Sequence, residues 1–189
     1  MQQLLSFPSS RIAMLKVNHF LIGPPSSGKS TLAAKLTQLD SEAVIVATDA
    51  IRALLFGDEN IQGEWSLIEQ EVLSQMAAAF SAGRRVIYDA TNAKREWRCS
   101  LLNLLADKNL PWLGWQVTTP LETCLLWNQQ RQRQVPASVI ENLYHALQEV
   151  PPQATEGFVA IIRIGMIRGE LNWQQIERQL PLFCDIKYD

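Results

Sequence analysis

The sequence predicts one α/β domain built on a five-stranded parallel β-sheet that helices cover on both faces. Short apolar runs of a few residues alternate with longer segments in which apolar residues recur at helical spacing. That alternation is typical of βαβ units, whose strands are buried on both faces. No repeat or linker divides the 189 residues, a length that one domain can hold around a single core.

Five segments are expected to be strands because each is a short apolar run bounded by turn residues. They are residues 17–22, 43–47, 85–89, 112–117 and 158–164. The clearest helix is 64–82, where Trp65, Ile68, Val72, Met76 and Phe80 form one apolar stripe. Other helices are expected from residue 29, and over 48–55, 94–108, 121–133, the stretch after Pro136 to 149, and 173–180.

The boundaries and composition indicate a single domain over residues 16–189, preceded by a loose arm over residues 1–15. The net charge of −2 lacks the basic excess of proteins that hold nucleic acid mainly by its phosphates. Three cysteines at long spacings favour reduced thiols and a cytoplasmic location. No apolar run is long enough to span a bilayer, and nothing indicates an oligomeric state.

A phosphate-binding loop is the most specific motif. Gly23-Pro24-Pro25-Ser26-Ser27-Gly28-Lys29-Ser30 matches the pattern GxxxxGK[ST], between an expected strand and an expected helix. Glycines allow the backbone amides to fold around an anion, and the helix N-terminus adds further donors. Lys29 is expected to bind the β and γ phosphates of ATP, and Ser30 to bind Mg²⁺, with Thr31 completing the loop.

The acceptor side is suggested by Asp49 and Arg52, which follow the second expected strand. In an open α/β sheet, ligands bind at the carboxyl ends of the strands. A carboxylate there can accept the proton of a hydroxyl nucleophile, and an arginine can hold an anionic group of the acceptor. Spacing alone leaves a second interpretation equally open, in which Asp49 caps a helix and Arg52 is solvated.

Two further groups extend this site. Asp89 ends the third expected strand in the run Asp89-Ala90-Thr91-Asn92, where an aspartate can order Mg²⁺ and its waters, or merely cap the next helix. Arg131 and Arg133 lie at the basic end of the helix expected over 121–133. They are candidates for a helical lid, residues 121–150, that closes over ATP. The alternative is a solvated helix end.

Taken together, these motifs resemble the kinase domain of the polynucleotide 5′-hydroxyl kinases of the end-healing type, P-loop kinase-like proteins of the AAA-type ATP-binding group. The resemblance covers residues 20–162 and includes GPPSSGKST, TDAIR, DATN, NQQRQRQVPASVI and EGF, in that order. It implies that Asp49 deprotonates the acceptor hydroxyl, that Arg52 binds an acceptor phosphate, and that Arg131 belongs to the lid. The sequence departs from the family at Trp127, where an arginine is usual.

The sequence therefore predicts an ATP- and Mg²⁺-dependent kinase whose acceptor is an RNA or DNA 5′ end. Two other functions remain open: a kinase acting on a small metabolite or a tRNA-linked hydroxyl, and an ATPase or nucleotide switch without an acceptor. His19 is expected to be a core or surface histidine and not a catalytic one, and most of the tryptophans are expected to pack in the core, except Trp127, which lies beside the expected lid. The basic residues Arg84, Arg85, Lys94, Arg95 and Arg98 are expected to form a solvated face rather than a guide for a polyanion.

Overall fold

The computed structural model describes residues 17–183. The arm expected over residues 1–15 lies outside the described residues. Within 17–183, no helix is long and apolar enough to cross a membrane.

One five-stranded sheet forms the centre of the molecule, in the order β2-β3-β1-β4-β5. Its strands are β1 (Asn18–Ile22), β2 (Ala43–Ala47), β3 (Arg85–Asp89), β4 (Trp112–Val117) and β5 (Ala160–Ile164). All of its strand pairs are parallel, which confirms the predicted architecture. Because β1 lies between β3 and β4, the connections on its two sides run in opposite directions, and in such sheets ligands bind beyond the carboxyl ends of the strands at this point.

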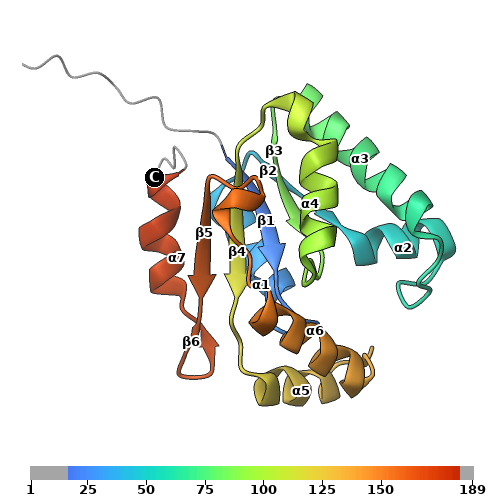
Figure 1. Ribbon diagram of the computed structural model, residues 1–189, viewed down its shortest axis with the longest axis vertical. Helices are drawn as coiled ribbons and strands as arrows, with labels where there is room; N and C mark the ends of the chain where they lie inside the picture. The colour runs from blue at the N-terminus through green and yellow to red at the C-terminus, as the bar shows by residue number, and fades with distance from the viewer. Residues whose placement is uncertain (1–16, 184–189) are drawn as a thin grey trace, which may run out of the picture.

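Helices cover both faces of this sheet (Figure 1). They are α1 (Lys29–Leu39), α2 (Thr48–Phe56), α3 (Trp65–Ser81), α4 (Arg95–Leu104), α5 (Leu121–Gln129), α6 (Ala137–Glu149) and α7 (Trp173–Gln179). One core cluster joins α1 and α7 to the sheet, and the other joins α2, α3, α4 and α6 to it. In Figure 1 the arrowheads of β1, β4 and β5 point toward α5 and α6, so these two helices lie at the carboxyl edge.

Three features differ from the sequence predictions. The helix expected to run to Arg133 ends at Gln129, because a turn that precedes Pro136 separates α5 from α6. A small hairpin, β6 (Met166–Ile167) and β7 (Glu170–Leu171), follows β5 and was not predicted. Trp65 and Trp97 were expected in the core but are 49% and 43% exposed, and each lies in the first turn of its helix.

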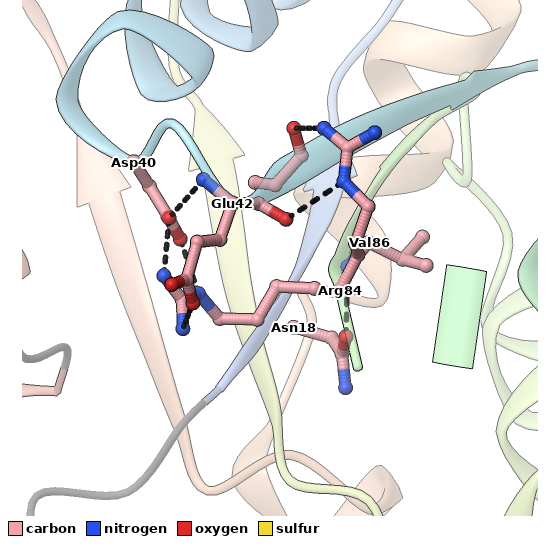
Figure 2. A network of polar contacts seen from close by, with 7 residues as sticks. Asn18, Asp40, Glu42, Arg84 and Val86 are labelled. Carbon is pink, nitrogen blue, oxygen red and sulfur yellow. Dashed lines mark hydrogen bonds and ion pairs between the residues drawn. The ribbon is translucent and has the colours of Figure 1, made fainter. Parts of the chain in front are cut away.

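The amino ends of the strands are held by the polar network of Figure 2. Arg85 pairs with Asp40 through two hydrogen bonds and with Glu42 at 3.3 Å, while Arg84 donates to the Glu42 carbonyl. The Asn18 side chain accepts from the Val86 amide at 2.8 Å. These contacts join β1, β2 and β3 at the edge opposite the phosphate loop. The expectation that Arg85 is solvated is therefore wrong: its side chain is 11% exposed and is ion-paired.

Candidate active site

The phosphate loop connects β1 to α1, and its backbone takes unusual conformations. Gly28 has a φ of 96° and Ser26 a φ of 59°, values in the left-handed region that glycine adopts most readily. The Gly23 amide donates to the Thr91 carbonyl at 3.0 Å, so the loop is attached to the segment after β3. A Cβ on Gly23 would lie 2.7 Å from the Ser27 hydroxyl and 3.3 Å from the Val117 carbonyl oxygen, so a larger residue would force its neighbours to shift. The loop thus has a left-handed glycine at position 28 and a close approach at Gly23.

Lys29 is the first residue of α1 and is 8% exposed. Its Nζ donates to the Pro24 carbonyl at 2.8 Å, so its ammonium lies across the loop. Burial lowers the pKa of Lys29, and the carboxylates of Asp89 and Asp49 act in the opposite direction. A triphosphate would add strong negative charge next to this buried ammonium and would therefore favour its protonated form. Ser30 and Thr31 follow it and are exposed.

Asp49 and Arg52 lie on one face of α2, directly after β2. The Arg52 Nη1 donates to the Asp49 Oδ1 at 2.9 Å, and the Arg52 side chain is 14% exposed. Asp49 does not cap the helix, because the N-cap residue is Ala47 and no side chain caps the end. The Arg52 Nε is buried and has no hydrogen-bond partner among residues 17–183. This geometry disfavours the interpretation of a capping aspartate and a solvated arginine.

Asp89 ends β3 and is 8% exposed. In the sheet register it is paired with Ala47, two residues before Asp49. It does not cap the following helix, whose N-cap is Lys94. Within the described residues, no group of three or more His, Cys, Asp or Glu side chains could hold a metal ion. Oxygen ligands such as Ser30 and Asp89 fit Mg²⁺, which typically takes most of its ligands from phosphates and water.

Asn92 and Arg98 hold the segment after β3. The Asn92 side chain donates to the Leu21 carbonyl at 2.7 Å, and its φ of 50° is one that asparagine tolerates. Arg98 is fully buried and contacts both Glu156 oxygens at 2.6 and 2.8 Å. Its other N–H groups donate to the carbonyls of Asn92, Ala93 and Val150. The expectation that Arg98 belongs to a solvated face is therefore wrong.

Two residues that the sequence analysis did not identify, Thr119 and Asn128, form hydrogen bonds to the phosphate loop. Thr119 follows β4, and its hydroxyl donates to the Ser27 carbonyl at 2.7 Å. Asn128, at the end of α5, accepts from the Ser26 hydroxyl at 3.4 Å and from the Val135 amide at 2.9 Å, and donates to the Val135 carbonyl. The sequence signal for Asn128 was its place as the first residue of the block NQQRQRQVPASVI, one of the blocks that resemble the kinase family.

The two arginines that were predicted to belong to a lid lie in the turn between α5 and α6 and differ in their surroundings. Arg131 is exposed, and its charge acts on Lys29. Arg133 is largely covered, with its side chain 16% exposed, and its Nη1 lies 2.9 Å from the Asp49 Oδ2. It also lies 3.5 Å from the Glu59 Oε1. The structure therefore brings Arg133, expected to bind ATP, to Asp49, which was expected to serve the acceptor.

A pocket of about 390 Å³ opens beside the phosphate loop. It is lined by Gly28 and Thr31, by Trp127 of α5, and by the segment Gly169–Leu171 with Trp173. The hairpin that was not predicted thus forms one wall. Trp127 packs close to the loop, since a Cβ on Gly28 would lie 3.6 Å from its ring.

The family of the chain follows from these features and from a family model described as an AAA domain, which matches residues 19–150. The chain belongs to this AAA domain family. Its fold is that of a P-loop kinase. No curated protein matches the chain.

Several solved structures share the fold. A chain of the Pnkp1/Rnl/Hen1 RNA repair complex is 23% identical with a TM-score of 0.63, covering 74% of this chain. The present chain spans only 46% of that chain's length. A putative kinase from Chloroflexus aurantiacus has a TM-score of 0.64 at 15% identity, covering 91% of this chain and 100% of its own. Shikimate kinase from Bacteroides thetaiotaomicron has a TM-score of 0.57 at 16% identity, covering 88% and 97%.

Proposed function

We propose that the protein is an ATP-dependent phosphotransferase that moves the γ-phosphate of ATP to a hydroxyl group. The supporting observation is the pair of Asp49 and Arg52, which lies at the same sheet edge as the phosphate loop. An enzyme that only hydrolyses ATP has no need of a second site with a carboxylate and a buried guanidinium. The best candidate acceptor is the 5′-hydroxyl end of a polynucleotide, in keeping with the motif order and with the likeness to a chain of an RNA repair complex.

The ATP phosphates are assigned to the loop 23–31, meaning Gly23, Pro24, Pro25, Ser26, Ser27, Gly28, Lys29, Ser30 and Thr31. Backbone amides and the Lys29 ammonium neutralise the phosphate oxygens. Ser30 and Asp89 are the residues that would hold Mg²⁺, which would supply charge neutralisation when bound. Arg131, which faces solvent and acts on Lys29, is assigned to the transferring phosphoryl group.

The nucleobase is assigned to the pocket beside Gly28 and Thr31. Trp127 and Trp173 both line this pocket. An indole can stack on a base, which stabilises it by about 1–3 kcal/mol. This assignment makes Trp127 a base-stacking residue at a sequence position where the family usually has an arginine.

In the transfer step, the acceptor oxygen bonds to the γ-phosphorus while the bond from that phosphorus to the β,γ-bridging oxygen breaks, releasing ADP. Asp49 accepts the hydroxyl proton. Arg52, whose Nε has no hydrogen-bond partner within residues 17–183, holds an anionic group of the acceptor. Catalysis arises mainly from positioning and charge neutralisation.

A second candidate is a kinase that acts on a small metabolite or a tRNA-linked hydroxyl. The net charge of −2 favours it, because a polynucleotide-binding protein usually has a basic excess. Both candidates use the same Asp49 and Arg52. Both are assigned to the cytoplasm, where ATP is available and where Cys99 and Cys124 would stay as the free thiols observed.

Phosphate transfer from γ-labelled ATP distinguishes these candidates. The acceptors are 5′-hydroxyl RNA and DNA oligonucleotides of one sequence, with 5′-phosphorylated copies as matched controls and Lys29→Ala as the inactive enzyme. Label on the 5′-hydroxyl oligonucleotides alone supports a polynucleotide kinase. Label on none of them, with ATP bound, excludes these acceptors and favours the second candidate.

A further inference from the structure

The acceptor carboxylate contacts a separate guanidinium through each of its two oxygens. Arg52 lies 2.9 Å from the Asp49 Oδ1, and Arg133 lies 2.9 Å from the Asp49 Oδ2. Arg52 belongs to the same helix as Asp49, but Arg133 comes from the lid turn, 84 residues further along the chain. The orientation of the Asp49 carboxylate therefore depends on where the lid lies.

The lid turn has a second attachment, at the phosphate loop. Asn128 receives a hydrogen bond from the Ser26 hydroxyl at 3.4 Å and exchanges two hydrogen bonds with Val135. The Arg131 amide donates to the Asn128 carbonyl at 3.2 Å. One short segment, residues 128–135, thus contacts the ATP-binding loop at its start and the acceptor carboxylate through Arg133.

We propose that Arg133 is a positioning residue of the acceptor site, and that it couples the lid to the orientation of Asp49. This inference rests on the proposed function. Arg133 fixes the rotation of the Asp49 carboxylate from one side while Arg52 fixes it from the other. Each carboxylate oxygen retains a lone pair that can accept the hydroxyl proton of the acceptor. Glu59, 3.5 Å from the same guanidinium, holds Arg133 in place.

Arg131 and Arg133 consequently have different tasks, although they lie two residues apart. Arg131 is exposed, and besides burial its charge contributes to lowering the pKa of Lys29, so the proposed function assigns it to the triphosphate. Arg133 is largely covered, and its Nη1 contacts the carboxylates of Asp49 and Glu59, so this arrangement directs that nitrogen to the acceptor side and not to the ATP phosphates. Binding of ATP at the loop would hold the lid turn and thereby complete the acceptor site. Arg133, the lid arginine nearer the acceptor, then affects kcat/KM for the acceptor more than KM for ATP.

Steady-state kinetics of Arg133→Ala, with ATP and acceptor varied separately, test this assignment. We expect kcat/KM for the acceptor to fall on the order of tenfold to a hundredfold, as small misplacements of a catalytic group do. KM for ATP should stay within about twofold. Arg133→Lys should recover part of the loss, since one ammonium can still reach one oxygen. Arg178→Ala, an exposed arginine on α7, is the matched control.

Hydrogen exchange supplies a readout that needs no acceptor. The Arg131 and Val135 amides are hydrogen-bonded to Asn128, so their exchange reports on the lid turn. Asp49→Ala and Arg133→Ala should each speed exchange there several-fold, and the double variant should be no faster than either alone.

The outcomes separate the inference from the function on which it rests. A change in KM for ATP without a change in kcat/KM for the acceptor would indicate that Arg133 binds the triphosphate. That result would overturn the inference. If the wild type phosphorylates no acceptor, the proposed function fails, and the exchange data still decide the contact: unchanged exchange in Asp49→Ala overturns it.

Discussion

Replacing Glu156 with glutamine removes the charge that compensates a fully buried arginine. The Arg98 and Glu156 side chains are 0% and 1% exposed. Arg98 has five N–H donors, which are directed at both Glu156 oxygens and at the carbonyls of Asn92, Ala93 and Val150. In Glu156→Gln the shape is retained, but one guanidinium N–H would face an amide NH₂ group, and the buried positive charge would have no counter-ion.

Breaking a buried pair in this way costs about 3–5 kcal/mol, because the remaining charge is uncompensated. We expect Glu156→Gln to lie at the lower end, about 3 kcal/mol, since glutamine still accepts one hydrogen bond. With a urea dependence of about 2 kcal/mol per molar for a domain of this size, the unfolding midpoint should fall by about 1.5 M.

Arg95→Ala provides the matched control. Arg95 approaches the same carboxylate, with 3.9 Å between its Nε and the Glu156 Oε1, but its side chain is 59% exposed. An exposed pair of this kind contributes at most about 1 kcal/mol. Urea unfolding followed by circular dichroism compares the two variants. If the unfolding midpoint of Glu156→Gln shifts no more than that of Arg95→Ala, the buried Arg98–Glu156 pair does not contribute the stability assigned to it.

Two further predictions concern the core and the nucleobase pocket. Burial lowers the pKa of His19 from 6.5 to about 4, so the unfolded chain binds more protons than the folded one between these pH values. The free energy of unfolding should therefore fall by about 2 kcal/mol from pH 7 to pH 5 in urea titrations, and a His19→Asn variant with the same pH dependence would contradict this. Trp127→Ala should weaken ATP affinity about tenfold, as loss of base stacking does, with little change in kcat at saturating ATP. Calorimetry measures the affinity for ATP, and Trp97→Ala, at an exposed tryptophan, is the control. Equal ATP affinities in the two variants would mean that the base binds elsewhere.

The sheet and the phosphate loop could be predicted because their signals are local. Each strand is a short, mostly apolar run, and Gly28 takes a left-handed backbone conformation that few other residues adopt. The pairing of Asp49 with Arg52 could be predicted for the same reason, since residues three apart on a helix are neighbours.

The remaining contacts join residues far apart in the sequence. Arg98 and Glu156 are 58 residues apart, and Ser26 and Asn128 are 102 apart. An arginine within an amphipathic helix is usually solvated, so only the fold shows that Arg98 is buried. The β6–β7 hairpin has strands of two residues, too short for a periodic pattern. Its turn at Arg168 and Gly169 has positive φ at both positions, and arginine there gives no turn signal.

In the proposed function Asp49 serves the acceptor and not ATP. The most direct measurement compares wild type and Asp49→Asn for two properties: affinity for ATP with Mg²⁺ and transfer of labelled phosphate to an acceptor that the wild type uses. We expect Asp49→Asn to bind ATP nearly as tightly as the wild type but to transfer phosphate at least about a hundredfold more slowly, the scale of a lost general base. Equal loss of binding and transfer, or transfer that persists at the wild-type rate, would contradict this role of Asp49.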